Sequence, residues 1–211
     1  MTKKHFRSLV SMRDAVEPRI SVRDAILDVT DRLLARYGYK KMTIDDLAHE
    51  VGIGKGSVYL HFSSKEEIVL SHIDRIIERM KRRLREIAAK PDPIDERLCE
   101  MLLERVLFRF DSVQHYSQSL NELLANVRPG LLIRRKKHFQ EEGRIFAEVI
   151  AEGQKDGKLI SGDALDHAFT LLTATNSLLP YSLSVTELGE RKEVEERTVR
   201  TATVLIRGLM A

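Results

Sequence analysis

The sequence lacks the features that disulfide-stabilised, membrane-spanning and secreted proteins share. Its 211 residues include a single cysteine, Cys99, which excludes an internal disulfide and a metal site built from cysteines. Cys99 stands in an apolar helical pattern, so we interpret it as a small core residue, with a redox-sensing thiol as the alternative. No window holds the roughly eighteen uninterrupted apolar residues of a membrane-spanning helix, and no apolar segment of a secretory signal follows the basic first residues. We therefore expect a cytoplasmic protein that crosses no membrane.

Catalytic and cofactor-binding motifs are missing as well. The seven histidines are scattered without the spacing of metal ligands, and neither an HExxH nor a GxSxG pattern occurs. The stretch Gly52–Ser57 has the glycines and lysine of a phosphate-binding loop, but it lacks the Gly-Lys-Ser/Thr ending and follows no predicted strand. We therefore expect no enzyme, no cofactor and no metal.

The net charge of +3 is unevenly distributed along the chain. Residues 1–64 hold eleven of the 35 Lys and Arg residues and eight of the 32 Asp and Glu residues, whereas the rest of the chain has 24 of each. A positive N-terminal part suits a polyanionic partner. If charge were the only observation, an ordinary solvated surface would be the favoured interpretation.

Apolar residues recur every three or four positions over most of the chain, which predicts helices. No alternating run bounded by turn residues predicts a strand. Glycine and proline break the pattern, most clearly at Gly38, at Pro91 and Pro93, and at Pro129-Gly130. The sequence therefore predicts an all-α protein of about nine helices, near residues 21–37, 43–51, 55–61, 65–89, 94–111, 114–127, 131–155, 163–181 and 190–209.

Residues 43–62 have the pattern of two short helices joined by a tight, glycine-containing turn. Six apolar residues of this stretch are expected to be buried between the helices: Ile44, Leu47, Val51, Ile53, Val58 and Phe62. The residues left exposed on the second helix include no carboxylate: Lys55, Gly56, Ser57, Tyr59, Leu60 and His61. A helix that faces phosphates should have this composition, because a carboxylate there would be repelled.

This stretch and its neighbours resemble the DNA-binding domain of TetR-type transcriptional regulators. The resemblance covers about residues 20–68 and rests on Gly38-Tyr39, Met42-Thr43, Ile44-x-x-Leu47-Ala48, Val51-Gly52-Ile53, Gly56-Ser57-Val58-Tyr59-x-His61-Phe62 and Lys65-Glu66. Weaker similarity continues at residues 152–159 and 204–209. It implies a helix-turn-helix domain at 19–64 and a larger helical domain at 65–211 that binds an effector and dimerises. Residues 1–18 would be an N-terminal arm, either a frayed tail or a basic segment along DNA.

The resemblance also implies roles for individual residues. Lys55, Gly56 and Ser57 begin the recognition helix, where base edges are read in the major groove. Leu60 lies on the same exposed face. Four residues would contact phosphates: Thr43, Tyr59, His61 and Lys65. Thr43 would offer its hydroxyl or its backbone amide, and His61 could reach a base instead. For Lys55, direct base readout and simple phosphate attraction both remain open. The family usually has serine where this chain has Gly54, a weaker N-cap, so the recognition helix is expected to order fully only on DNA.

The resemblance implies a homodimer formed by the helices near 163–181 and 190–209, and therefore a palindromic operator. The apolar residues of these helices would alternatively fill the core of one protomer. Six residues of the middle helices are candidates for effector binding, although each would also serve as a packing residue: Phe108, Phe110, His115, Tyr116, His138 and Phe146. Asn176, a polar residue of the apolar helix near 163–181, is a similar candidate, with a hydrogen bond to the backbone as the alternative. We expect a repressor released by a small, mostly apolar effector. The rival hypothesis is a helical dimeric interaction protein with a vestigial DNA-binding motif.

Overall fold

The structure, a computed structural model, describes residues 21–114, 120–180, 187 and 189–211. This part of the chain forms eight α-helices and one short 3₁₀ helix, and its only β-type pairing is one isolated bridge between Leu159 and Met210. The prediction of an all-α protein is confirmed. The helices are α1 (Val22–Lys41), α2 (Ile44–Val51), α3 (Lys55–His61), α4 (Lys65–Ala88), α5 (Ile94–Val113), α6 (Leu120–Lys155), α7 (Ala164–Thr175), the 3₁₀ helix η2 (Asn176–Leu178) and α9 (Arg191–Arg207).

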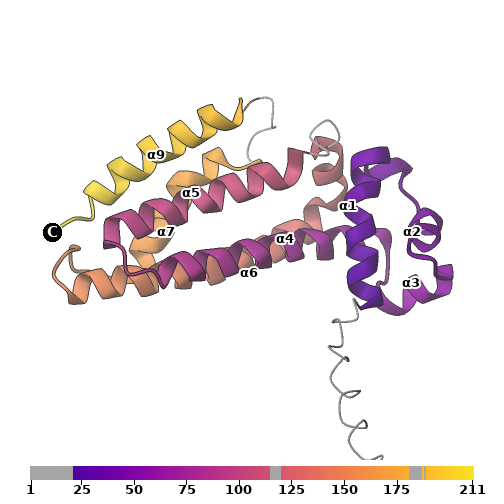
Figure 1. Cartoon of the computed structure of the whole chain (residues 1–211), viewed down its shortest axis with the longest axis horizontal. Coiled ribbons are helices and arrows are strands. Elements are labelled where there is room, and N and C mark those ends of the chain that lie inside the picture. The colour runs from indigo at the N-terminus through magenta and orange to yellow at the C-terminus, as the bar shows by residue number, and fades with distance from the viewer. Residues whose placement is uncertain (1–20, 115–119, 181–186, 188) are drawn as a thin grey trace, which may run out of the picture.

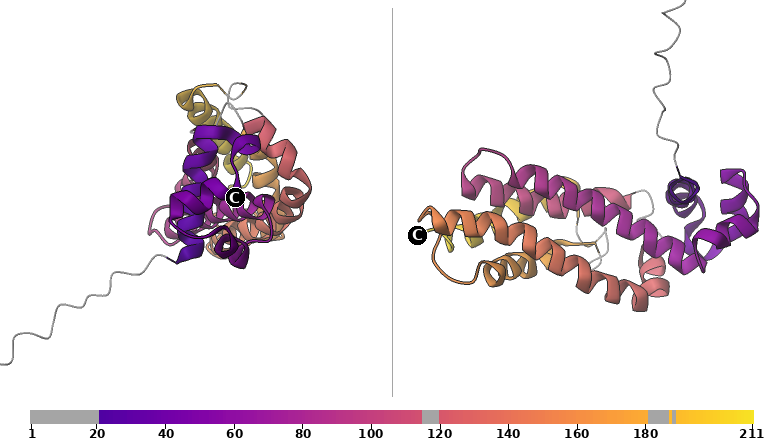
Figure 2. Two further views of the ribbon diagram at one scale, coloured as in Figure 1. Left: turned by 90° about the vertical axis from the view of Figure 1, so that its right-hand side faces the viewer. Right: turned by 90° about the horizontal axis from the view of Figure 1, so that it is seen from below.

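The helices are arranged in two groups (Figure 1). Helices α1, α2 and α3 form a cluster at one end, and α4, α5, α6, α7 and α9 form an elongated bundle. Seen from below, α1 is viewed nearly end-on, so it crosses the long axis of the bundle (Figure 2). The predicted arm at residues 1–18 lies outside the described residues, as do His115 and Tyr116. No helix among the described residues is long and apolar enough to span a membrane.

One apolar core holds the cluster together and continues into the bundle. It contains Ile26 and Leu34 of α1 and Leu47 of α2, together with Val69 of α4 and Val127 of α6. The core therefore crosses the boundary expected at residues 64 and 65. A second core fills the bundle between α4, α5, α6, α7 and α9. The two cores make α4 and α6 the elements that both groups share.

The prediction of a helix break at Pro129 was wrong. Helix α6 runs without interruption through this proline, over 36 residues. Proline removes one backbone donor and crowds the preceding turn, and both effects bend a helix. The helix can continue past the proline when the residues on both sides of it are packed against other helices. Here Leu123 and Val127 are buried before Pro129, and Leu131 packs on the same core after it. Figure 1 shows the first turns of α6 running at an angle to the rest of the helix.

The helix expected over 163–181 is shorter than predicted. Helix α7 ends at Thr175, and one 3₁₀ turn follows before the chain becomes extended at Leu179, with φ −99° and ψ 144°. Leu179 precedes Pro180, and a residue before proline disfavours helical backbone angles. Most of the apolar residues that suggested a partner surface are buried in the protomer's own cores: Ala168, Leu171, Leu172 and Leu178. Their apolar character is therefore accounted for without a second chain.

Cys99 packs against the second core and is partly buried. Burial, with a smaller contribution from Asp95, raises the pKa of its thiol above the ordinary value. A raised pKa disfavours the reactive thiolate. The structure thus favours the interpretation of Cys99 as a packing residue.

Candidate nucleic-acid interface

The turn between α2 and α3 is set by Gly52. This residue has φ 77° and ψ 33°, a left-handed conformation that glycine adopts without strain. The reversal lets the Ile53 amide donate to the Ala48 carbonyl oxygen at 2.9 Å. Ala48, Val58 and Phe62 are buried where the two helices meet. The α2–α3 pair is therefore a helix-turn-helix with a fixed crossing, as the sequence predicts.

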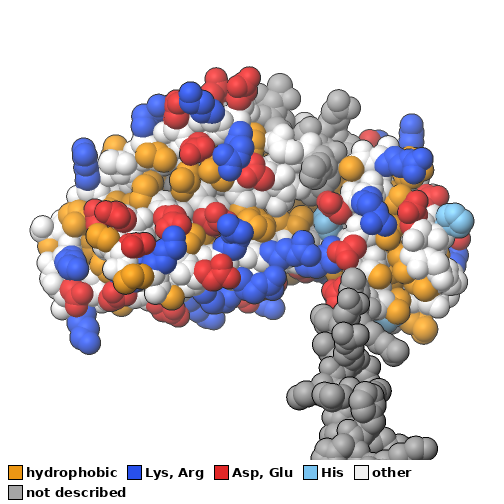
Figure 3. Space-filling view, viewed as in Figure 1, with side chains coloured by type: hydrophobic (Ala, Val, Ile, Leu, Met, Phe, Trp, Pro, Cys, Tyr) orange, Lys and Arg blue, Asp and Glu red, His pale blue; other side chains and the backbone are white. Residues whose placement is uncertain are grey.

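The outward face of α3 has the composition that the sequence predicts. Lys55, Gly56, Tyr59, Leu60 and His61 are exposed, and no residue of the helix is acidic. Ser57 is half-buried, and Leu60 is 84% exposed. In the space-filling view, apolar and uncharged side chains predominate at the right-hand end near α3, whereas charges of both signs are interspersed over the bundle (Figure 3). The face therefore offers uncharged and positively charged groups to another molecule, with Leu60 as its most exposed apolar side chain.

Lys55 forms an ion pair across the motif. Its Nζ lies 2.7 Å from a carboxylate oxygen of Asp45 on α2. The hydrogen bond and the negative charge of Asp45 raise the pKa of Lys55, so the ammonium group stays charged. Both side chains are largely exposed, and such pairs contribute little to stability. A phosphate or a base acceptor can therefore replace Asp45 at small cost.

Thr43 caps α2 through a reciprocal pair of hydrogen bonds with Asp46. The Asp46 amide donates to Thr43 Oγ1 at 3.1 Å, and the Thr43 amide donates to Asp46 Oδ2 at 2.9 Å. The Thr43 hydroxyl also donates to Asp46 Oδ2, and this bond, together with that of the Thr43 amide, lowers the pKa of Asp46 below its ordinary value. Both donors that were expected to reach a phosphate are thus engaged, since the hydroxyl also donates to Asp46. A phosphate at this end of α2 would have to compete with Asp46.

Lys65 has a structural role that the sequence reasoning missed. Its Nζ donates to the carbonyl oxygens of Tyr39 at 3.0 Å and Met42 at 3.2 Å. The same ammonium group lies 4.4 Å from the centroid of the Tyr39 ring, within the range of a cation–π interaction. Lys65 therefore fastens the start of α4 to the connection between α1 and α2. The pairing joins residues 26 apart in sequence, and no local pattern reveals it.

Polar contacts continue this attachment along α4. Arg75 of α4 lies 2.8 Å from Asp28 of α1, and Arg134 of α6 lies 2.6 Å from Glu67 of α4. Arg134 also pairs with Asp74, about two turns further along α4. Helix α4 is therefore held to the cluster on one side and to α6 on the other. A shift of α6 would be transmitted to α1 through these contacts.

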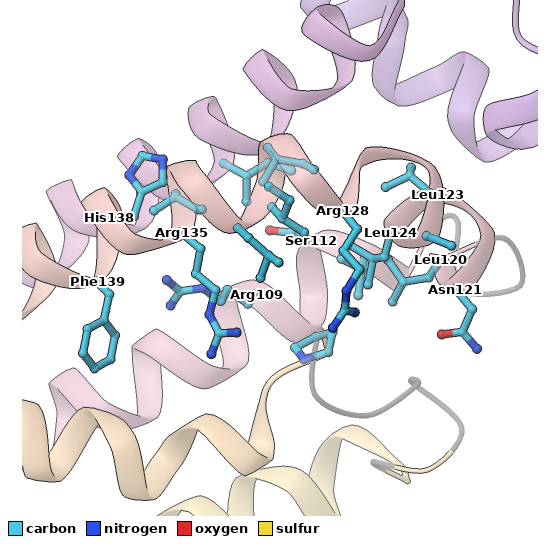
Figure 4. Close-up of a pocket in the computed structure, with 18 of the residues that line it drawn as sticks. Arg109, Ser112, Leu120, Asn121, Leu123, Leu124, Arg128, Arg135, His138 and Phe139 are labelled. Carbon is cyan, nitrogen blue, oxygen red and sulfur yellow. The ribbon is translucent and has the colours of Figure 1, made fainter.

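A cavity of about 480 Å³ lies between α4, α5 and α6 (Figure 4). Much of its wall is aliphatic, with side chains from all three helices. Four arginines also line it: Arg105 and Arg109 from α5, and Arg128 and Arg135 from α6. This size is typical of sites that enclose small organic molecules. The bundle therefore contains a candidate ligand site behind the helix-turn-helix.

The residues predicted to bind an effector are not gathered at this cavity. Of the five that lie among the described residues, only His138 lines it. Phe146 is buried in the second core, and Phe110 is buried in a smaller third core with Val106 of α5 and Val194 of α9. Phe108 lines a separate depression near Asp111. Asn176 accepts a hydrogen bond from Arg105 at 2.8 Å. The sequence reasoning missed the arginines, because the partners of Arg105 lie 37 and 71 residues away in the sequence and no local pattern reveals them.

Two of these arginines are held by one buried carboxylate. Glu142 of α6 accepts from Arg105 Nε at 2.7 Å and also pairs with Arg109. Burial opposes the charged form of Glu142, but Arg109 and Arg105 outweigh it and hold the pKa below its ordinary value. Arg105 also donates to the Thr175 hydroxyl at 3.1 Å. This charged group therefore joins α5, α6 and α7 beside the cavity.

A second polar group lies next to the cavity on α4 and α6. His138 Nε2 lies 2.7 Å from Asp74, and its other ring nitrogen faces Lys81 at 3.3 Å. Lys81 donates to Glu78 at 2.5 Å and to Glu141. The spacing of Glu78, His138 and Glu141 would suit a metal ion, but the ammonium group of Lys81 lies among them. The lysine thus supplies the positive charge that a metal would bring.

Comparisons with known proteins agree with this arrangement. The sequence model of the bacterial regulatory proteins of the tetR family matches residues 26–71. The HTH-type transcriptional repressor KstR2 of Rhodococcus jostii is 30% identical over 158 residues, which cover 72% of this chain and 75% of that protein. A regulator of the fatty acid metabolism of Bacillus subtilis is 29% identical over 73 residues, 33% of this chain and 38% of its own length.

Solved structures share the whole fold. A transcriptional regulator from Cytophaga hutchinsonii superimposes with a TM-score of 0.72 at 20% identity, covering 88% of this chain and 97% of its own. A regulator of the TetR/AcrR family from Thermobifida fusca has a TM-score of 0.63 at 26% identity, with the same coverage. With its helix-turn-helix, its all-α bundle and these relatives, the chain belongs to the TetR family of DNA-binding transcriptional regulators.

Proposed function

We propose that this protein is a repressor that binds a palindromic operator as a homodimer and is released by a small molecule bound in the bundle cavity. The observation that carries the proposal is the outward face of α3. It is exposed and free of carboxylates, and buried residues of α2 and α3 pack beneath it. Repression is supported by the name of the KstR2 relative. Action on operator DNA would place the protein in the cytoplasm.

The residues of α3 would divide their roles by position. Lys55, Gly56 and Ser57 would approach base edges, with Lys55 exchanging Asp45 for an acceptor on DNA. Leu60 is best suited to the methyl group of a thymine, because it offers no hydrogen bond and is fully accessible. Tyr59 and His61 would contact phosphates.

The two remaining candidates, Thr43 and Lys65, are engaged within the protein. A phosphate contact of Thr43 would require exchange of its Asp46 partner. The Lys65 ammonium group already donates to the Tyr39 carbonyl oxygen, so fewer of its donors remain for a phosphate. We therefore expect both to contribute to operator affinity mainly by positioning α2 and α4. Their substitution would lower stability together with DNA affinity.

Dimerisation is supported by family membership and by the outer face of α9. Val204 of this helix is 72% exposed, and Val199 is also exposed. Apolar side chains at these positions suit an interface between two copies. A two-fold dimer would present two α3 helices to successive major grooves, one helical turn apart.

Release would act through α4, which borders the cavity and holds the cluster. A ligand that displaces α6 or α4 changes the angle at which each α3 is presented. Only different affinities for two conformations can shift the equilibrium, and a coupling of about 1–3 kcal/mol is typical of such systems. The contacts of Arg134 with Glu67 and Asp74 would carry the displacement.

A salt titration of DNA binding tests the proposed function against a vestigial motif. Phosphate contacts release counterions, so the logarithm of the binding constant should fall steeply with the logarithm of the salt concentration, by about 0.9 per phosphate neutralised. The purified protein and a duplex recovered from a random library supply the sample. Binding that is absent, or that does not change with salt, would support the rival hypothesis of an interaction protein.

A further inference from the structure

The first turns of α6, residues 120–128, have two neighbouring faces that meet different parts of the molecule. One face is buried in the apolar core that the α1–α3 cluster shares with the bundle, and it consists of Leu120, Leu123 and Val127. The next face round the helix lines the cavity and consists of Asn121, Leu124, Ala125 and Arg128 (Figure 4). Each set has the three- or four-residue spacing of a single helix face. This lever segment, as we call residues 120–128, therefore touches both the cavity and the cluster that contains the helix-turn-helix.

The lever segment also contacts residues 38–43, which form the end of α1 and the connection to α2. Gly38 leaves the helical conformation, with φ 71° and ψ 173°. The Lys40 amide that follows it donates to Glu122 Oε1 at 3.1 Å, and Lys40 Nζ lies 3.5 Å from the other carboxylate oxygen of Glu122. From α4, Lys65 donates to carbonyl oxygens of the same stretch. The connection to the helix-turn-helix is therefore held from two sides, by α4 and by the lever segment of α6.

The lever segment ends at Pro129 and Gly130, where α6 changes direction (Figure 1). Proline removes one backbone hydrogen bond, so the helix resists a change of angle less at this point than elsewhere. Gly130 lies directly against α4, because a Cβ atom at this residue would come within 2.5 Å of Leu70 Cδ1. The bend thus rests on α4, and the segment before it can turn relative to the rest of α6.

We propose that the lever segment couples the cavity directly to the helix-turn-helix, without passing through α4. A molecule in the cavity pushes on the cavity face of the segment and turns it about Pro129 and Gly130. Glu122 moves with the segment, which loosens its contact with Lys40 and the connection to α2. This route is additional to the contacts of Arg134 with α4. Release of DNA along it rests on the proposed function, whereas the coupling itself does not.

A substitution takes the place of a ligand in the test. Ala125→Trp adds an indole ring to the cavity face of the lever segment, at a residue outside the buried core face. The chain has no tryptophan of its own, so a blue-shifted emission establishes that the ring lies in the cavity. If the emission is that of an exposed ring, Leu124→Trp replaces it, because Leu124 is half-buried on the same face. Ala151→Trp is the matched control: it makes the same change at an exposed position of α6 that does not line the cavity.

Hydrogen exchange of the full chain, followed by mass spectrometry, measures the coupling. Ala125→Trp should raise the exchange rate of residues 38–43 by about twofold or more, the lower end of the coupling expected within one contact network. It should leave the exchange of α9 unchanged. Ala151→Trp should leave both regions as they are in the parent protein. The operator affinity of Ala125→Trp should fall by about fivefold or more, as is typical of coupled sites.

Two further substitutions identify the route of the coupling. Glu122→Ala removes the contact with Lys40, so adding Ala125→Trp to it should raise the exchange of residues 38–43 by less than in the parent protein. Arg134→Met removes the ion pairs with α4, and the effect of Ala125→Trp should persist in it. Thermal unfolding curves establish that each variant is folded.

Three results would overturn the proposal. The first is that the indole ring enters the cavity and the exchange of residues 38–43 does not change. The second is that Ala151→Trp raises this exchange as much as Ala125→Trp does. The third is that the effect is undiminished in Glu122→Ala or lost in Arg134→Met, and the latter would assign the coupling to α4. Faster exchange with unchanged operator affinity would leave the coupling standing and contradict release by a ligand.

Discussion

The two ends of the molecule depart from the ordinary pattern of burial in opposite directions. On α3 the apolar Leu60 is 84% exposed, whereas in the bundle the charged Arg105 and Glu142 are 1% and 2% exposed. The buried charges oppose folding because they are desolvated, whereas the exposed leucine forgoes the stabilisation that burial would bring. Such departures are expected where a protein meets its partners. The comparison teaches that the exposed apolar end suits a macromolecule and the charged interior suits a small ligand.

Removing the buried carboxylate should have the largest effect. Glu142→Ala leaves Arg105 and Arg109 without the acid that they share, and breaking a buried pair in this way costs about 3–5 kcal/mol. Urea unfolding of the purified variant measures the loss. Glu148→Ala, at an exposed position of the same helix, should change the free energy of unfolding by less than about 0.5 kcal/mol. Equal effects of the two substitutions would show that the buried pairs do not hold the bundle.

The opposite test adds a charge to the apolar end. Leu60→Asp places a carboxylate on the face proposed to meet DNA, so operator affinity should fall by about 1–3 kcal/mol, roughly fivefold to 150-fold. Stability should not change, because the side chain is exposed. A fluorescence polarisation titration with labelled operator gives the affinity.

Ile133→Asp is the control for that substitution. It makes the same change at an exposed apolar residue of α6, which is 76% exposed and distant from α3 in the sequence. It should leave the operator affinity as it is in the parent protein. If both variants bind DNA normally, α3 is not the reading helix.

Acid should weaken the bundle before it affects the exposed face of α3. Burial alone would raise the pKa of Asp74, but its hydrogen bond with His138 and the charge of Arg134 outweigh burial and lower the pKa. Glu142 is lowered for the same kind of reason. A carboxylate whose pKa is lower in the folded state stabilises fully above its unfolded value, about 4, and this stability is lost as the pH falls through the folded pKa.

Unfolding followed by circular dichroism between neutral pH and about pH 2 measures this dependence. The parent protein should lose stability progressively below about pH 4. The Asp74→Asn variant should be less stable at neutral pH and should show a shallower decline in acid. A decline of the same steepness in both proteins would mean that Asp74 contributes nothing to it.

The two glycines of the turn should respond with opposite signs. Gly52→Ala forces a residue with a Cβ into φ 77° and should cost about 1 kcal/mol, although the added atom would meet no neighbour. Gly54 has φ −73° and ψ 149°, open space around it and no side-chain cap. Gly54→Ser should therefore stabilise by a few tenths of a kcal/mol, because serine caps the first turn of α3.

Thermal unfolding of the two glycine variants checks the signs. Operator binding by Gly54→Ser adds a further test, because the cap orders α3 before it meets DNA and should raise the affinity slightly. A stabilising Gly52→Ala would contradict the left-handed turn. A destabilising Gly54→Ser would contradict the position of α3's first residue.

The helix-turn-helix could be predicted from the sequence because its determinants are local. The spacing of Leu47, Val58 and Phe62 specifies a buried face, and Gly52 specifies the reversal between the helices. Each of these signals acts within about twenty residues of chain. The predicted exposed face of α3 follows from the same pattern, so it needed no knowledge of the bundle.

The cavity and the ends of α6 and α7 could not be predicted in this way. Arg105 meets Glu142 37 residues later and Asn176 71 residues later, and neither pairing has a local signature. Pro129 lies within a helix because residues on both sides of it are packed by other helices. Tertiary contacts therefore determine the cavity and the ends of α6 and α7, and they override the local preferences of the sequence.

Selection of bound duplexes from random DNA by the purified protein tests the central claim most directly. The account predicts enrichment of a sequence with two-fold symmetry, whose half-sites lie about one helical turn apart, and loss of that enrichment in Leu60→Asp. The contradictory result is a folded parent protein that enriches no sequence, or one that enriches the same sequence when Leu60 is replaced by aspartate.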